Sequence, residues 1–387
     1  MAKFNFDEII NRKNTYSLKW DFNKERNHDE DELSMWVADM DFKLPDDVIN
    51  PLISKVNEGI FGYSDVKDDL LESISNWYLK SYNTKVDKLS IIINPSVVFS
   101  ICSLIRILTK ENDYIIINEP VYYPFKESII LNNRKAISSD LIIEDNKYVI
   151  DFEDFENKIK KYNVKLYILC SPHNPVGRVW DKEELLRIID ICNKNNVKII
   201  SDEIHADFCY NKKFTSILAL DDNAIVVNAP TKSFNIPAFK ISYAIINDKN
   251  IYNEYKKELD RVGYSQQSIM GIIATIAAYN NGRLWLEEVK KYIWNNILYI
   301  KSFIVEKLPK IKFIVPEGTY LIWLDFREYK LKNNELRDLM KKAKLWLDDG
   351  FIFGRAGEGF ERINVATNRS NIDKMLNSLY GAINNLK

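Results

Sequence analysis

The segment KLYILCSPHNPVGRVWDKEELLRIIDICNKNNVKIISD (165–202) indicates the fold class of this chain. An apolar run of β-forming residues is followed by apolar residues at helical spacing and then by a second apolar run. Asp181 stands where the helical pattern begins and is a candidate N-cap. A strand, a helix and a second strand in this order predict two parallel strands joined by a right-handed crossover.

Three more apolar runs accompany this unit, namely SIIIN (90–94), DYIIIN (113–118) and AIVVN (224–228). Strands that are apolar along their whole length are typical of a sheet covered by helices on both faces. We therefore expect an α/β fold, with a mostly parallel sheet flanked by helices, in a large domain formed by residues 47–281.

The C-terminal third has a different pattern. GRLWLEEVKKYIWNNILYIKSFIVEKL (282–308) predicts a long helix, and KFIVPEGTYLIWLDF (312–326) predicts two strands around a glycine turn. Helices are expected near 333–343 and 370–386. Together with the N-terminal segment, these elements predict a smaller α+β domain made of residues 1–46 and 282–387.

Composition excludes several classes of partner. The 54 Lys and Arg residues nearly balance the 55 Asp and Glu residues, so no net charge draws the chain to nucleic acid or to an anionic membrane. The four cysteines are far apart and match neither a metal site nor a secreted disulfide framework. We see no signal peptide and no apolar run approaching the ~18 residues of a membrane helix. A cytoplasmic protein is expected.

The residues that follow the predicted strands are candidates for a binding site, because ligands bind at the carboxyl ends of the strands in an open α/β sheet. In chain order these residues are PSVV (95–98), which leads into a helix, Tyr122 and Tyr123 in EPVYYPF, Asn174 in SPHNPVG, Asp202 at the end of VKIISD, and Lys232 in APTKSFN. The free N–H groups of a helix N-terminus bind phosphate well. Each of the other residues has a purely structural reading as a turn, a cap or a packing residue.

Taken together, these residues suit a flat, phosphorylated, cationic heteroaromatic ligand. Pyridoxal phosphate fits this description, because its aldehyde forms a Schiff base with a lysine and its ring nitrogen needs a carboxylate. Its ring also needs a flat partner. The sequence thus predicts a pyridoxal phosphate site that contains Lys232 and Asp202.

Several longer motifs resemble those of a known family. They are WVADMDF (36–42), FGYS (61–64), PVYYPF (120–125), SPHNPVGRVW (171–180), SDEIHADF (201–208), APTKSFNIP (229–237) and RINVATNRS (362–370). They look like the pyridoxal-phosphate-dependent carbon–sulfur lyases of the cystathionine β-lyase (MalY/PatB) type, a branch of the class I/II aminotransferase-like enzymes of fold type I.

The resemblance implies a role for each site residue. Lys232 would hold the cofactor and move the Cα proton, Asp202 would pair with the ring nitrogen, and Asn174 would bond the ring 3-oxygen. Tyr122 would stack on the ring, Tyr123 would lie near the substrate, and Arg362 would bind the substrate α-carboxylate. The phosphate would be surrounded by Ser96, Val97, Val98 and Thr231. Tyr63 would reach the phosphate from the other subunit of a homodimer. Three assignments have alternatives: Lys240 is either a phosphate ligand or a solvated lysine, His205 either assists at the 3-oxygen or is structural, and Arg369 could replace Arg362.

The function implied by the resemblance is β-elimination from a sulfur amino acid. L-cystathionine would yield homocysteine, pyruvate and ammonia, and cysteine or its S-conjugates would also react. Two alternatives remain at this stage. An aminotransferase of the class I/II type would use the same cofactor motifs, and a cofactor-binding regulator of a transcription factor would show the same site.

Overall fold

The structure is a computed structural model that describes residues 4–386. Its centre is a seven-stranded sheet in the order β2-β10-β9-β8-β7-β3-β4. These strands are β2 (Ile91–Asn94), β3 (Tyr114–Ile117), β4 (Lys135–Ser138), β7 (Leu166–Cys170), β8 (Lys198–Asp202), β9 (Ile225–Asn228) and β10 (Ser242–Ile245). The β10 strand runs antiparallel to its neighbours β2 and β9, and the pairs from β9 through β4 are parallel. The mostly parallel sheet is confirmed, and β4 and β10 are strands that the sequence did not indicate.

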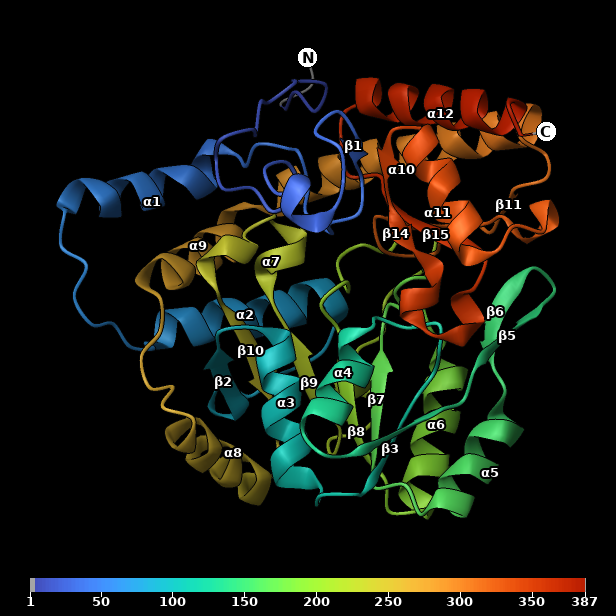
Figure 1. The fold of residues 1–387 in the computed structure, drawn as a ribbon. Coiled ribbons are helices and arrows are strands. Elements are labelled where there is room, and N and C mark those ends of the chain that lie inside the picture. The colour runs from blue at the N-terminus through green and yellow to red at the C-terminus, as the bar shows by residue number, and fades with distance from the viewer. Residues whose placement is uncertain (1–3, 387) are drawn as a thin grey trace.

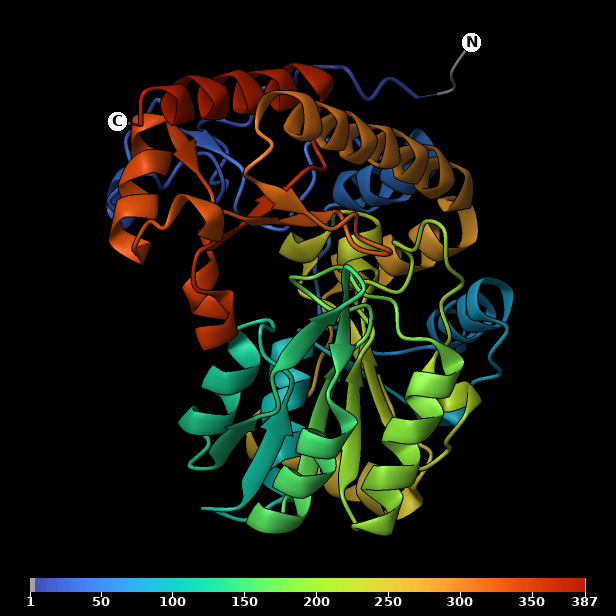
Figure 2. The ribbon, with the colours of Figure 1, turned by 90° about the vertical axis from the view of Figure 1, so that its right-hand side faces the viewer.

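The large sheet lies between two layers of helices (Figures 1 and 2). Side chains that alternate along its strands belong to two different cores. In β7, Leu166, Ile168 and Cys170 belong to one core, and Tyr167 and Leu169 belong to the other. The first core includes α3 (Val97–Leu108), α4 (Pro124–Leu131) and α8 (Lys249–Arg261). The second includes α2 (Asp68–Tyr82), α5 (Phe152–Tyr162) and α6 (Lys182–Lys194). Burial on both faces explains why these strands are apolar throughout.

The crossover predicted from residues 165–202 is present, with α6 joining β7 to β8. Asp181 is the N-cap of α6, and its backbone N–H donates to Glu184 Oε2 at 2.7 Å. Strands β7 and β8 pair in parallel, with Cys170 opposite Asp202 at their carboxyl ends. The helix cap and the strand register therefore place Asp202 at the same edge of the sheet as the turn that follows β7.

A second, four-stranded sheet in the order β11-β12-β15-β14 lies above the carboxyl ends of the large sheet (Figure 2). Its strands are β11 (Lys312–Phe313), β12 (Leu321–Asp325), β14 (Asp348–Asp349) and β15 (Phe360–Asn364), and the accompanying helices are α10 (Arg283–Lys307), α11 (Asn333–Lys342) and α12 (Arg369–Asn384). The N-terminal segment joins this part, because β1 (Leu33–Ser34) pairs in parallel with β13 (Leu345–Trp346). The division into domains at residues 47 and 281 stays a prediction.

The remaining elements surround these two sheets. They are α1 (Asp46–Glu58), the hairpin of β5 (Leu141–Glu144) and β6 (Lys147–Ile150), the short helix α7 (Pro230–Ser233) and α9 (Ile269–Asn281). Figure 1 shows α1 and the segment that joins it to α2 at the periphery of the molecule. None of the helices among residues 4–386 combines the length and the apolar character needed to cross a bilayer.

Candidate active site

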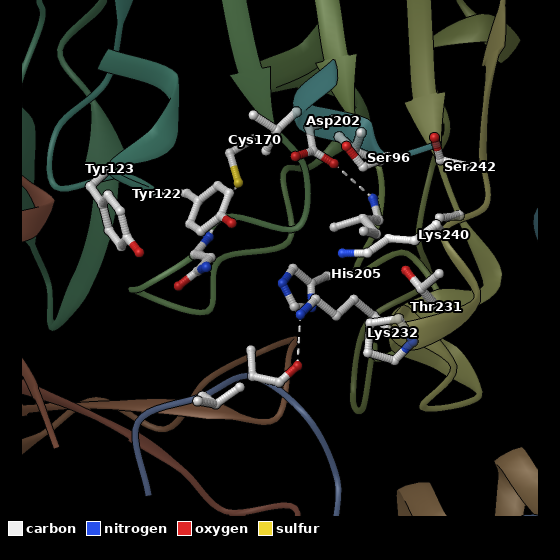
Figure 3. Close-up of a pocket in the computed structure, with 18 of the residues that line it drawn as sticks. Ser96, Tyr122, Tyr123, Cys170, Asp202, His205, Thr231, Lys232, Lys240 and Ser242 are labelled. Atoms are coloured by element: carbon white, nitrogen blue, oxygen red, sulfur yellow. Dashed lines mark hydrogen bonds between the residues drawn. The ribbon is translucent and has the colours of Figure 1, made fainter. Parts of the chain in front are cut away.

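A cavity of about 310 Å³ lies at the carboxyl ends of the large sheet. Its lining includes the following residues expected from the sequence: Ser96, Val97, Val98, Tyr122, Tyr123, Asn174, Asp202, His205, Thr231, Lys232, Lys240 and Arg362. Figure 3 shows Tyr122 and Tyr123 on one side of this cavity and Thr231 and Lys232 on the other. The structure thus brings together side chains from six strand ends and from the second sheet.

Lys232 lies in the short helix α7, directly after β9. Its Nζ donates to the carbonyl oxygen of Ala38 at 2.6 Å (Figure 3). Burial lowers the pKa of Lys232 to about 8, with Arg362 adding to the shift and Asp39 and Asp202 opposing it. A lysine with a lowered pKa has a larger fraction of neutral amine near pH 7, as a nucleophile or a base requires.

Asp202 ends β8, and its Oδ1 accepts a hydrogen bond from the backbone N–H of Ile204 at 3.1 Å. Burial raises the pKa of Asp202 to about 7, although this bond and the charge of Lys232 oppose the shift. Within residues 4–386 the carboxylate has no ion-pair partner. It would therefore gain from a cationic N–H group inside the cavity.

The aromatic side of the cavity is formed where β3 leads into α4. The ring centroids of Tyr122 and Tyr123 are 5.6 Å apart, and Tyr122 meets Phe125 edge to face at 5.9 Å. Burial raises the pKa of both tyrosines. The two phenols are therefore neutral, and they supply flat surfaces rather than charge.

The opposite end of the cavity is suited to an anion. Ser96 caps α3, and its Oγ accepts a hydrogen bond from the backbone N–H of Phe99 at 3.1 Å. The helix N-terminus at Val97 and Val98 therefore faces the cavity with its positive dipole. Thr231 and Lys240 lie at the same end, with the Lys240 amine turned into the cavity (Figure 3). Ser242, which the sequence did not indicate, lines the cavity beside them.

Arg362 lies in β15 and reaches the cavity from the second sheet. Its Nη1 donates to Asn174 Oδ1 at 3.1 Å, its Nη2 donates to the carbonyl oxygen of Trp36 at 3.0 Å, and it forms an ion pair with Asp348. The guanidinium also lies over the ring of Phe353, at 4.8 Å from its centroid. Its buried Nε–H has no partner among the described residues.

Sequence reasoning missed the residues that hold Arg362 and Lys232. Trp36 and Ala38 stand in the motif WVADMDF, which carried the resemblance without a role for either residue. Nothing in the sequence marked Asp348, because its position depends on the pairing of β14 with β15, which sets it opposite Arg362.

Three further residues occupy distinct positions. His205 is buried with no partner for Nδ1 among residues 4–386, and burial lowers its pKa well below the usual range, so the ring is neutral. Tyr63 is 98% exposed and does not line this cavity. Arg369 also lies outside the lining, at the start of α12, where its guanidinium packs on Tyr299 at 4.2 Å from the ring centroid.

The donor set fits the pyridoxal phosphate that the sequence predicts. Asp202 offers a carboxylate without an ion pair, and Lys232 offers an amine with a lowered pKa. Asn174 uses its oxygen for Arg362, which leaves its amide hydrogens free to donate to a ring oxygen. The N-terminus of α3 adds a helix dipole and free N–H groups, which suit a phosphate.

Comparison with known proteins agrees with this geometry. The model of the family "Aminotransferase class I and II" matches residues 33–379. The cystathionine β-lyase PatB of Bacillus subtilis is 36% identical over 98% of this chain and 100% of its own length. A pyridoxal-phosphate-bound putative aminotransferase from Clostridium difficile is 43% identical, with a TM-score of 0.96 over 98% of this chain and 100% of its own. A pyridoxal-phosphate-bound C–S lyase from Staphylococcus hominis is 30% identical, with a TM-score of 0.93 over 98% of both chains.

These similarities extend over nearly the whole chain and include both sheets. They confirm the expected fold class and the resemblance to carbon–sulfur lyases of the MalY/PatB type. The chain belongs to the aminotransferase class I and II family.

Proposed function

We propose that this protein is a pyridoxal-phosphate-dependent carbon–sulfur lyase. It cleaves L-cystathionine to homocysteine, pyruvate and ammonia by β-elimination, and it also acts on cysteine or its S-conjugates. The observation that carries the proposal is that Lys232, Asp202 and Arg362 line one cavity beside Tyr122 and the N-terminus of α3. The similarity to PatB and to the S. hominis enzyme supports the lyase over other reactions of this site.

When bound, pyridoxal phosphate supplies a cationic conjugated ring that accepts the electron pair left when Cα loses its proton. Asp202 would hold the ring N–H, Asn174 would donate to the ring 3-oxygen, and Tyr122 would supply a flat surface for the ring. The residues that would bind the phosphate are Ser96, Val97, Val98, Thr231 and Lys240. His205 lies beside these residues as a neutral donor or acceptor.

The substrate is held and deprotonated by side chains of this chain. Arg362 binds the α-carboxylate with its planar guanidinium, which orients the Cα–H bond. Lys232 takes the Cα proton, and its pKa of about 8 is near the value that favours proton transfer at neutral pH. The Cβ–S bond then breaks, and the thiolate leaves past Tyr123. The released three-carbon enamine hydrolyses to pyruvate and ammonia.

In the proposed assembly, two subunits form a homodimer with shared active sites. Tyr63 of one subunit would reach the cofactor phosphate in the site of the other. The exposure of Tyr63 supports this arrangement, because it stands beside Ile60 and Phe61, which are 67% and 57% exposed. An exposed apolar segment of this kind is typical of an interface. The free state of all four cysteines supports a reducing, cytoplasmic location, which cell fractionation tests.

The test of the proposed function is pyruvate release from L-cystathionine by the cofactor-loaded protein with no 2-oxo acid present. We expect continuous pyruvate formation with an equal amount of homocysteine. A stoichiometric requirement for a 2-oxo acid would instead show an aminotransferase, the activity suggested for the relative from C. difficile.

A further inference from the structure

A second cavity of about 280 Å³ adjoins the candidate active site. Trp36, Tyr123 and Asp348 line both cavities, so the two spaces meet at these side chains. Tyr123 lies on the side of the first cavity away from Lys232 (Figure 3). A ligand that reacts at Lys232 and extends past Tyr123 would therefore enter the second cavity.

The second cavity has an excess of positive charge. Among its acidic residues, Asp348 is paired with Arg362, and Asp349 accepts from Arg337 at 2.8 Å. Glu361 is buried, and burial raises its pKa well above the usual range, which keeps it neutral.

Two cations in this lining remain uncompensated. Arg26 and Lys341 form no ion pair within residues 4–386. Arg26 lies in the short helical turn of Lys24–Arg26, and its guanidinium is 5.1 Å from the centre of the Trp36 ring. The cavity therefore favours an anionic group near the junction with the active site.

One wall of the cavity is a stack of three rings. The His28 and Trp346 rings are 4.1 Å apart with an interplanar angle of 14°, and the Trp346 and Trp36 rings are 4.7 Å apart at 21°. Trp36 Nε1 is buried and has no hydrogen-bond partner among the described residues. The wall thus offers aromatic ring edges to a methylene chain, with an unpaired indole N–H beside the guanidinium of Arg26.

We propose that the second cavity receives the distal end of the substrate and that Arg26 determines specificity by binding a distal carboxylate. This inference rests on the proposed function and names the substrate class as sulfur amino acids with a second carboxylate beyond the sulfur. L-cystathionine carries this carboxylate next to an ammonium group. The methylene chain lies along the ring stack, and Trp36 and Lys341 assist Arg26.

The test compares L-cystathionine with S-methyl-L-cysteine, which has no distal carboxylate, in the cofactor-loaded protein. Arg26→Gln should lower the ratio of kcat/KM for L-cystathionine to that for S-methyl-L-cysteine by about tenfold to hundredfold, mainly through KM. Lys24→Gln is the matched control, because it removes one positive charge from the same turn, where Lys24 pairs with Glu30. The control should keep the ratio of the unsubstituted protein. An unchanged ratio in Arg26→Gln would overturn the inference.

Equilibrium binding separates this inference from the proposed reaction. In the cofactor-loaded Lys232→Ala background, titration calorimetry should show that Arg26→Gln weakens binding of L-cystathionine by a similar factor and leaves the dissociation constant of S-methyl-L-cysteine within twofold. If Lys232→Ala binds in this way but the protein with Lys232 intact releases no pyruvate, the distal site stands and the lyase assignment fails. If both substrates are cleaved but Arg26→Gln weakens both equally, the lyase assignment stands and the distal site fails.

Discussion

Arg362 and Asp348 form an ion pair in which both side chains are almost completely buried, with exposures of 5% and 8%. Burial raises the pKa of Asp348 even though Arg362 opposes the shift. The cost of removing the two charges from water therefore offsets much of their attraction. The pair serves to hold the guanidinium at the cavity beside Asn174 and Trp36.

Asp348→Asn should lower the free energy of unfolding by about 3 kcal/mol, because it leaves the buried guanidinium of Arg362 without its counter-charge. Denaturant unfolding of the cofactor-loaded protein measures this loss. Asp349→Asn is the control, since its pair with Arg337 is partly exposed and should contribute less than about 1 kcal/mol. Equal losses in the two variants would contradict this account of the pair.

Lys232→Ala should reduce kcat by about 10²-fold to 10⁴-fold or more, because the chain then lacks the base that moves the Cα proton. It should also abolish the covalent bond to the cofactor, which mass spectrometry after borohydride reduction detects. Lys240→Ala is the comparison. It should keep the covalent bond and weaken cofactor binding, since its amine lies at the anion end of the cavity. A borohydride-fixed cofactor in Lys232→Ala would refute the role of this lysine.

Asp202 should make the stability of the cofactor-free protein depend on pH. Its folded-state pKa of about 7 lies above the ordinary value of 3.8, so the folded chain binds this proton more tightly than the unfolded chain. The contribution of Asp202 to the free energy of unfolding, on the order of 4 kcal/mol, is fully present below pH 3.8. It is lost as the pH rises through 7.

Asp202→Asn cannot ionise, so its free energy of unfolding minus that of the unsubstituted protein should increase between pH 4 and 7 and then level off. Denaturant unfolding at several pH values measures this difference. The increase of this difference with pH should be smaller when pyridoxal phosphate is bound, because a cationic ring nitrogen then compensates the carboxylate. A difference that is flat across this pH range would contradict the raised pKa.

Hybrid dimers test the shared site. Lys232→Ala and Tyr63→Ala should each have low activity alone. After the two are mixed, unfolded and refolded together, each mixed dimer contains one site with both residues intact. With random pairing about a quarter of all sites recover, because the two subunits are related by a twofold axis. Recovery that stays at the sum of the two parent activities would place Tyr63 and Lys232 in the same subunit or remove Tyr63 from the site.

The sequence predicted β2, β3, β7, β8 and β9 and the residues at their carboxyl ends, because these follow from local patterns. It did not indicate β4 and β10. Apolar runs located β7 and β8, and Asn174 lies in the turn after β7 whereas Asp202 is the last residue of β8. The parallel order of strands then implies that such residues meet. Asp348 and Ala38 could not be predicted in this way. Their contacts with Arg362 and Lys232 depend on how the second sheet and the N-terminal segment pack on the first.

The position of β10 in the large sheet has a consequence for the order of folding. β2 is an edge strand whose neighbour in the sheet is β10, with Ile91 opposite Ile245. During synthesis, β2 therefore cannot pair with its neighbour in the sheet until the chain has been made as far as residue 245. Contacts between segments so distant in sequence form slowly. The N-terminus of α3 follows β2 directly, so its final position depends in part on this pairing, together with the contacts of α3 with α4 and β9. A nascent chain that stops before β10 contains Lys232 and Asp202 but leaves β2 without its partner strand in the sheet.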